Sequence, residues 1–241
     1  MRGVVTVVSI VAAAGCGFQP SGLGTAHDAP AGNSDGGDRD ATVAGDAGKV
    51  FMDGPVVLGS LTVTSMTLGN MDRDLSAEGS IDWAHWGHVA INDFDHRANG
   101  GTAISDLAAT PAVMFSGAPF TASWSGGTPH MNVAMTSTGV GVHAGSAMTF
   151  TVAAATTPRV LRLYVGAQAA TARLDVSLSD ASAPPQSETL ASAASTTNVC
   201  YTITFNAATA GKTLNISWSD TNDAGGGNSF AALLEATLAP N

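Results

Sequence analysis

Charged residues are scarce in this sequence, and most of the few that are present are acidic. Asp, Glu, Lys and Arg together make up 12 % of the chain, about half of what is typical of globular proteins. There are 9 Lys and Arg against 19 Asp and Glu, which gives a net charge of −10. A chain with this charge repels phosphate backbones and anionic lipid headgroups. The composition therefore argues against nucleic-acid binding.

The sequence also lacks the short motifs that carry common catalytic chemistry. It has no HExxH, no P-loop, and no GxGxxG between a strand and a helix, and its one GxSxG run, residues 32–36, lies in a Gly- and Asp-rich segment and not in a nucleophile elbow between a strand and a helix. A carboxylate pair for glycoside hydrolysis, such as Asp82 with Asp93 or Asp95, is conceivable, but no feature of the sequence selects one. We therefore expect a protein that is not an enzyme.

Cysteine is rare, and the N-terminal apolar run is short. Val4 to Ala14 cannot span a bilayer as a helix. This run follows an Arg and precedes small residues, which is the layout of a secretory signal. The second cysteine, Cys200, lies in a strand-like segment, and we expect it to be a buried, unpaired thiol.

The four residues Ala13-Ala14-Gly15-Cys16 resemble the lipobox of bacterial lipoproteins. The resemblance implies that residues 1–15 are a signal peptide, and that Cys16 is lipidated and anchors the chain to a membrane. It places the protein in the bacterial cell envelope, at the outer membrane or cell surface. A plain secretory signal that is cut nearby is the alternative.

Residues 16–54 contain little that a fold can bury. They are rich in Gly, Ala and Asp and have very few large apolar side chains, so they cannot offset the entropy lost on folding. We expect a disordered tether here, followed by one folded domain over residues 55–241.

Alternating apolar and polar residues dominate the region after residue 55. In RVLRLYV, residues Leu161, Leu163 and Val165 share one face, and in TLNISWS the inward set ends with Trp218. About ten such runs are separated by Gly, Pro, Asn and Asp clusters, which is typical of sandwiches and barrels. The pattern predicts an all-β fold: a two-sheet antiparallel β-sandwich, jelly-roll-like.

Several longer motifs resemble those of one family. From about Leu75 to Leu238, the order of SAEGSIDWAHWG, DHRANGG, SWSGGTP, LRLYVG, LSDASA and CYTITFNAATAGKTLNISW is similar to that of β-sandwich modules in secreted bacterial proteins. Those modules often stand beside glycoside hydrolases or lyases. The resemblance implies a galactose-binding-like jelly roll that serves as an accessory carbohydrate-binding or adhesion domain. The chain departs from the family pattern at Arg97, where Lys is usual, and at Gly126, where Asp is usual.

The segment Gly79–Gly100 is the richest in aromatic and polar side chains. Sugar recognition uses a flat aromatic face and polar groups for the hydroxyls. On a continuous strand Trp83 and Trp86 point to opposite faces. We expect Trp83 in the core and Trp86 with His88 accessible, unless Gly87 introduces a bulge that reverses this.

The second half of the same segment is predicted to be a turn at the rim of the sandwich, where binding residues are common. Together with the accessible strand residues it gives the predicted ligand-binding set: Trp86, His88, Asp93, Asp95, His96, Arg97 and Asn99. The alternative is that Asp95, with Arg97 or His96, only ties this turn to its neighbour. No zinc site is predicted from His85 and His88, because a strand would splay them.

No cofactor is predicted. Structural calcium is suggested by the resemblance alone, since such modules often hold one. The candidate oxygen donors have no diagnostic spacing; they are Asp72, Asp74, Glu78, Asp106, Asp220 and Asp223.

The sequence thus predicts a non-catalytic, lipid-anchored envelope protein whose β-sandwich binds carbohydrate. The alternative is a structural or adhesive module that binds another protein and has no glycan ligand.

Overall fold

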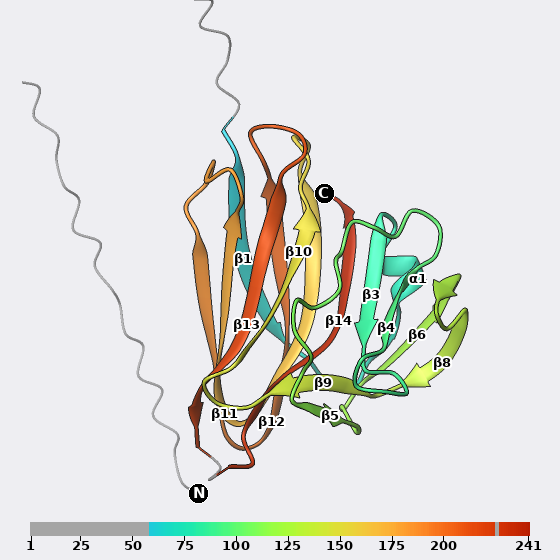
Figure 1. Cartoon of the computed structure of the whole chain (residues 1–241), viewed down its shortest axis with the longest axis vertical. Coiled ribbons are helices and arrows are strands. Elements are labelled where there is room, and N and C mark those ends of the chain that lie inside the picture. Colours follow the sequence, from blue (N-terminus) through green and yellow to red (C-terminus); the bar gives the residue numbers. More distant parts are fainter. Residues whose placement is uncertain (1–57, 225–226) are drawn as a thin grey trace, which may run out of the picture. The chain divides into compact units, whose positions relative to one another are not determined.

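The computed structural model describes residues 58–224 and 227–241, and this part of the chain is almost entirely β-strand (Figure 1). The predicted signal peptide, the lipidation site Cys16 and the tether lie outside the described residues. One short helix, α1 (Leu75–Glu78), is present among them. The strands are β1 (Ser60–Thr67), β2 (Asp72–Asp74), β3 (Asp82–Trp86), β4 (Phe94–Arg97), β5 (Val113–Phe115), β6 (Thr121–Ser125), β7 (Gly127–Thr128), β8 (Asn132–Thr136), β9 (Gly139–Val142), β10 (Ala147–Ala153), β11 (Arg159–Leu178), β12 (Gln186–Asn206), β13 (Thr213–Asp223) and β14 (Phe230–Pro240).

The long hairpin of β11 and β12 organises the large sheet. The two strands pair along almost their whole length. On the other edge of β11, the half from Arg159 to Gln168 pairs with β14, whereas the half from Ala170 to Leu178 pairs with β13. The sheet therefore divides into a first wing, β1-β12-β11-β14-β3-β4-β7, and a second wing, β12-β11-β13-β10.

A bulge marks the place where the wings diverge. The register of β11 against β12 shifts between Gln168 and Ala170, and Ala169 has a φ of 46°. Before the bulge the residues of β11 that belong to the main core have odd numbers, and after it they have even numbers. The extra residue thus keeps the apolar side chains on one continuous face while the strand bends. The alternating run RVLRLYV is therefore only the first half of one long strand.

The two wings pack face to face around the main core. Leu161 and Leu163 of the first wing share one apolar cluster with Phe150, Ile216 and Trp218 of the second. The Trp218 indole also donates a 2.9 Å hydrogen bond to the carbonyl of Ala232 in β14. In Figure 1, β10 and β13 lie in front of β11 and β14. The predicted all-β sandwich and the core position of Trp218 are confirmed.

A second, three-stranded sheet, β2-β6-β8, covers the outer face of the first wing. Arg73 of β2 lies over the ring of Tyr164 in β11, and Trp124 of β6 packs on Trp83 of β3 at 5.5 Å between ring centroids. Strands β14 and β3 are therefore buried on both faces. Within the described residues no helix is long and apolar enough to cross a membrane.

Three further features concern Cys200, residues 102–107 and the last strand. Cys200 is a free, buried thiol, as predicted. Residues 102–107 form no strand; they run beside β10 and make one isolated bridge, Ile104 with Val152. The last strand, β14, begins at Phe230.

Candidate functional site

Neither tryptophan of the segment Gly79–Gly100 forms an exposed platform. Trp83 and Trp86 are each 1 % exposed. Trp83 packs beneath the small sheet, and Trp86 lies in the main core, stacked on Phe94. The prediction that Trp86 is accessible on the strand surface is wrong, because β3 is covered on both faces; Trp86 is buried and borders only a small cleft.

The turn after β3 is held together by the side chains that were predicted to bind a ligand. Asp93 accepts hydrogen bonds from the backbone N–H groups of Val89 and Ala90, at 2.7 and 2.8 Å. Asp95 is fully buried and accepts 2.9 Å bonds from the backbone N–H and the ring nitrogen Nδ1 of His130. Asp95 therefore cannot meet a ligand at the surface, and its assignment as a binding residue is wrong.

Arg97 and His96 also contact groups in or near the turn. The Arg97 guanidinium donates to the carbonyls of Gly79 and Ser80 and so ties the turn to the start of β3. The His96 ring stacks on Phe94. Asp95 and Arg97 thus tie the turn to its neighbours, whereas the assignment of Arg97 as a ligand-binding residue stays a prediction.

The histidines gather under Trp124. Gly87 has a φ of +73°, which turns the chain so that the His88 ring lies 6.1 Å from the His85 ring and not on the opposite face. Burial lowers the pKa of His85 to about 3, so its ring is neutral. Over the described residues there is no group of three or more His, Cys, Asp or Glu side chains that could hold a metal ion.

The suggested calcium donors are scattered and have other partners. Asp74 caps helix α1, Glu78 accepts from the Tyr164 hydroxyl at 2.6 Å, and Asp220 accepts from Ser229 at 3.0 Å. Asp72 accepts from Thr121, and Asp106 from the backbone N–H of Leu107. The described residues give no oxygen cluster that fits calcium.

A row of polar side chains crosses the outer face of the first wing beneath the small sheet. Tyr164, Glu235, His85 and Asp95 are neighbours in register. Nε of Arg73 lies 3.2 Å from Oε1 of Glu235, and both side chains are almost fully buried. Burial raises the pKa of Glu235 to about 8, although Arg73 opposes the shift. These groups lie in the interior, so they serve the packing of the small sheet and not a ligand from solvent.

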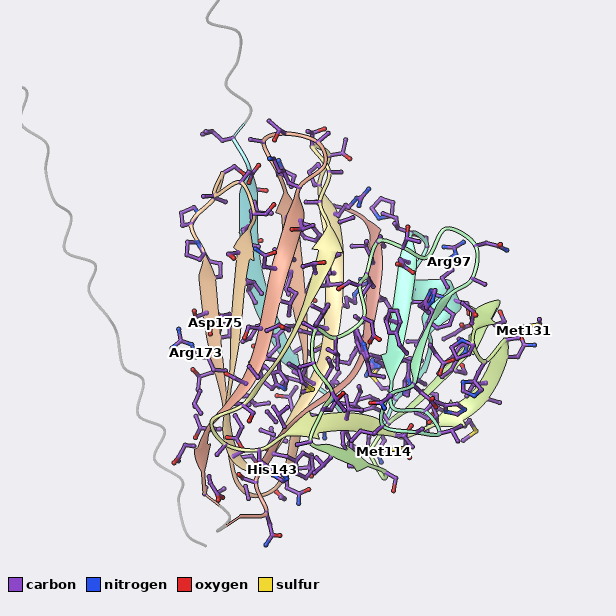
Figure 2. All side chains as sticks on the ribbon, in the orientation of Figure 1. Arg97, Met114, Met131, His143, Arg173 and Asp175 are labelled. Atoms are coloured by element: carbon purple, nitrogen blue, oxygen red, sulfur yellow. The ribbon has the colours of Figure 1, made fainter. Side chains whose placement is uncertain are left out.

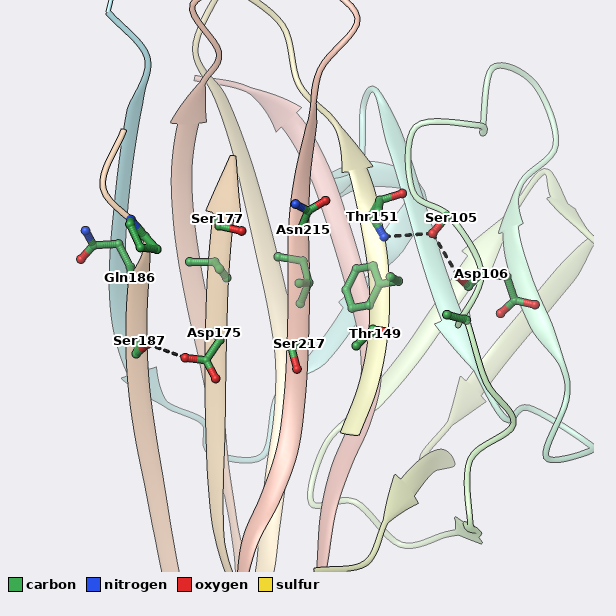
Figure 3. Close-up of a pocket in the computed structure, with 15 residues that line it drawn as sticks. Ser105, Asp106, Thr149, Thr151, Asp175, Ser177, Gln186, Ser187, Asn215 and Ser217 are labelled. Atoms are coloured by element: carbon green, nitrogen blue, oxygen red, sulfur yellow. Dashed lines mark hydrogen bonds between the residues drawn. The ribbon is translucent and has the colours of Figure 1, made fainter. Parts of the chain in front are cut away.

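A hollow lies on the outer face of the second wing, and we call it the groove. It has a volume of about 460 Å³ and crosses β12, β11, β13 and β10 (Figure 3). Its side chains come from alternate, outward-facing positions on these strands, which the pairing register brings together. They are mainly hydroxyl, amide and carboxylate groups: Thr149, Thr151, Asp175, Ser177, Ser187, Asn215 and Ser217.

Asp175 is the charged centre of the groove. Its Oδ1 accepts from the guanidinium of Arg173 at 2.8 Å and from the hydroxyl of Ser187 at 2.5 Å. Arg173 and Asp175 lie next to each other on β11, between β12 and β13 (Figure 2). Because these donors converge on Oδ1, the other oxygen, Oδ2, is the one that can accept from a ligand.

The groove is closed on one side by residues 103–108. Backbone hydrogen bonds hold this segment against β10: Ser105 donates to Thr151, and Ala108 donates to Thr149, both at 2.9 Å. The Ser105 hydroxyl also accepts from the N–H of Thr151. As a result Asp106, which is exposed, stands at the rim of the groove.

Two smaller hollows lie near the predicted site. The tryptophan cleft, of about 190 Å³, is lined by Trp86, Asp93 and Asp106 among others. A third hollow, of about 240 Å³, is lined by residues that include Arg97 and Asn99. Thus the structure separates the predicted residues: Trp86 and Asp93 line one cleft, Arg97 and Asn99 line another, and His88, Asp95 and His96 line none of the three.

The sequence analysis missed the residues of the groove. A signal was present in the polar alternate positions of the strands, Asp175 and Ser177 on β11 and Asn215 and Ser217 on β13. Any solvent-facing sheet surface has polar residues at alternate positions. Only the pairing register, which brings these four side chains together, distinguishes the groove from the rest of such a surface.

Comparisons with protein-family models, with curated proteins and with solved structures gave no match.

Proposed function

We propose that this protein binds carbohydrate without catalysis, through the groove on the outer face of the second wing. The observation that carries the proposal is the groove itself: a long hollow on a rigid sheet, lined by hydroxyl, amide and carboxylate side chains. These groups match the alternating donors and acceptors of sugar hydroxyls. The motif resemblance to secreted carbohydrate-binding modules supports the same conclusion.

The charges around the groove favour a neutral glycan. Asp106 and Asp175 are the acidic groups that line it, and the guanidinium beside it, Arg173, is already paired with Asp175. The chain as a whole carries a net charge of −10. Uronic acids and sulfated sugars would therefore be repelled.

We expect the full chain to bind neutral glycans on an array and to ignore acidic ones. Asn215→Ala and Asp175→Ala should each weaken binding roughly tenfold, because each removes one hydrogen-bonding group from the centre of the groove. Titration calorimetry with the strongest array ligand measures the change. Asn132→Ala is the matched control, since Asn132 is exposed on β8, away from the groove.

Two results would contradict this assignment. The first is silence of the folded wild-type protein across the whole array. The second is an equal loss of binding in the Asn215 and Asn132 variants.

A protein-binding role is the second candidate, and the exposed methionines favour it. Met66, Met71, Met114, Met131 and Met135 are between 38 and 69 % exposed, and Met114 and Met131 point outward in Figure 2. Exposed thioethers are adaptable contact groups. A silent array, together with capture of a protein partner that is lost in Met131→Ser but not in Asn215→Ala, would favour this role over glycan binding.

We further propose that the protein acts at the bacterial cell envelope, held by a lipid on Cys16. The lipobox-like residues before Cys16 support this. We expect Cys16→Ser to move the protein from the membrane fraction to the soluble fraction, as measured by fractionation and immunoblotting. Retention of the variant in the membrane fraction would show that Cys16 is not the anchor.

A further inference from the structure

The groove does not end at the edge of the second wing. Asp106 lines the groove on one side and the tryptophan cleft on the other. Backbone hydrogen bonds hold residues 103–108, and with them Asp106, against β10. The groove and the cleft are therefore neighbours across Asp106.

The tryptophan cleft is lined by a residue whose buried N–H donor has no acceptor. Trp86 forms part of its wall, and the Nε1 atom of Trp86 is buried without a hydrogen-bond partner. Buried indole N–H groups usually find one. Trp124 and Trp218 follow this rule, since their Nε1 atoms donate to the carbonyls of His130 and Ala232 at 3.0 and 2.9 Å.

Two of the other polar groups that line the cleft are carboxylate acceptors. Asp93 uses Oδ2 for the backbone N–H groups of Val89 and Ala90, and Asp106 uses Oδ1 for that of Leu107. One oxygen of each carboxylate thus stays available for a ligand. A donor and two carboxylate oxygens around one small hollow match a sugar hydroxyl group, which accepts and donates at once.

We propose that the tryptophan cleft is a second carbohydrate subsite, in which a hydroxyl oxygen accepts from the Trp86 N–H, and that the ligand is accordingly an oligosaccharide that continues from the groove past Asp106. The volume of about 190 Å³ is about six times a water molecule's share of the liquid, so it admits more than a single water. This inference rests on the proposed function of the groove.

The first test uses glycerol as a probe that does not depend on knowing the glycan. We expect the indole N–H resonance of Trp86 in the ¹⁵N-labelled full chain to move progressively on titration, because the N–H gains an acceptor. Trp86→Phe identifies the resonance by its loss, and Asp106→Asn should weaken the response. The resonance of Trp218, whose N–H already has an acceptor, should not move and is the internal control.

The second test uses neutral oligosaccharides of one to four residues, taken from the array ligands. Trp86→Phe should weaken binding of the tetrasaccharide roughly three- to tenfold, which is the usual contribution of one hydrogen bond. It should leave binding of the monosaccharide unchanged. Asn215→Ala should weaken every length. Circular dichroism confirms that the Phe variant, which keeps an aromatic ring in the core, is folded.

The outcomes separate the two proposals. A Trp86 resonance that stays fixed in glycerol, or a Trp86→Phe effect that is equal at every length, overturns the second subsite even if the array is positive. A moving Trp86 resonance with a silent array overturns the glycan function of the groove, while it supports the cleft as a site for hydroxyl groups.

Discussion

Replacing Arg73 by Ala should lower the free energy of unfolding by about 3–5 kcal/mol. The Arg73 side chain is buried with Glu235, and its guanidinium lies 4.0 Å from the Tyr164 ring centroid and 4.8 Å from that of Phe120. Without it, the Glu235 carboxyl loses its buried partner, and β2 loses the side chain that holds it to β11 and β14. Urea unfolding followed by tryptophan fluorescence measures the loss.

The control for Arg73 is the other paired arginine, Arg173, whose side chain is 50 % exposed beside Asp175. Arg173→Ala should lower the free energy of unfolding by at most about 1 kcal/mol, because exposed ion pairs usually contribute no more than that. The double variant Arg73→Met, Glu235→Leu should recover most of the loss, because two apolar side chains leave no buried charge. Equal effects of the two arginine replacements would contradict a structural role for the buried pair.

The pH dependence gives a further check on the same pair. The folded-state pKa of Glu235 is raised to about 8 from an ordinary 4.5, so its contribution to stability is complete below about pH 4.5 and is lost as the pH rises towards 8. Removing Arg73, which lowers this pKa, should raise it further. The variant should therefore continue to lose stability above pH 8, where the wild type levels off, and the difference between the two should grow.

Asp82→Ala should be comparably damaging, with an expected loss of about 3 kcal/mol or more. Asp82 is fully buried. Its Oδ1 accepts from the N–H of Trp83 at 2.8 Å, and its Oδ2 accepts from the N–H groups of Ala103 and Ile104, both at 2.9 Å. Alanine leaves all three donors buried without a partner, each at about 1–3 kcal/mol. Urea unfolding again measures the effect.

Asp82→Asn should cost less than Asp82→Ala, because one amide oxygen can still accept from Ala103 and Ile104. Asp106→Ala is the matched control, since Asp106 is exposed and accepts from one backbone N–H, that of Leu107. Asp82 also anchors the start of residues 103–108, which close one side of the groove. The glycan affinity of Asp82→Asn should therefore fall by more than the loss of folded protein accounts for. An Asp82→Ala protein as stable as the Asp106 variant would show that these hydrogen bonds contribute little.

The candidate site shows why sequence reasoning about β3 failed. The alternation rule assigns Trp83 and Trp86 to opposite faces, and this is correct. The rule does not say how many faces are covered, and β2-β6-β8 covers the second one. The same layer encloses Asp95 and His85, so polar residues that looked like a surface cluster became an interior network.

The sequence by itself determined the all-β class, the inward positions of Leu161, Leu163 and Trp218, and the buried thiol of Cys200. These follow from a period-two pattern that is local to each strand. Only the tertiary structure decided that β11 continues through a bulge at Ala169, that a small sheet covers β3, and where the groove lies. The groove gathers Asp175, Asn215, Thr149 and Asp106 from separate parts of the chain, and their juxtaposition depends on strand order and register, which no local pattern encodes.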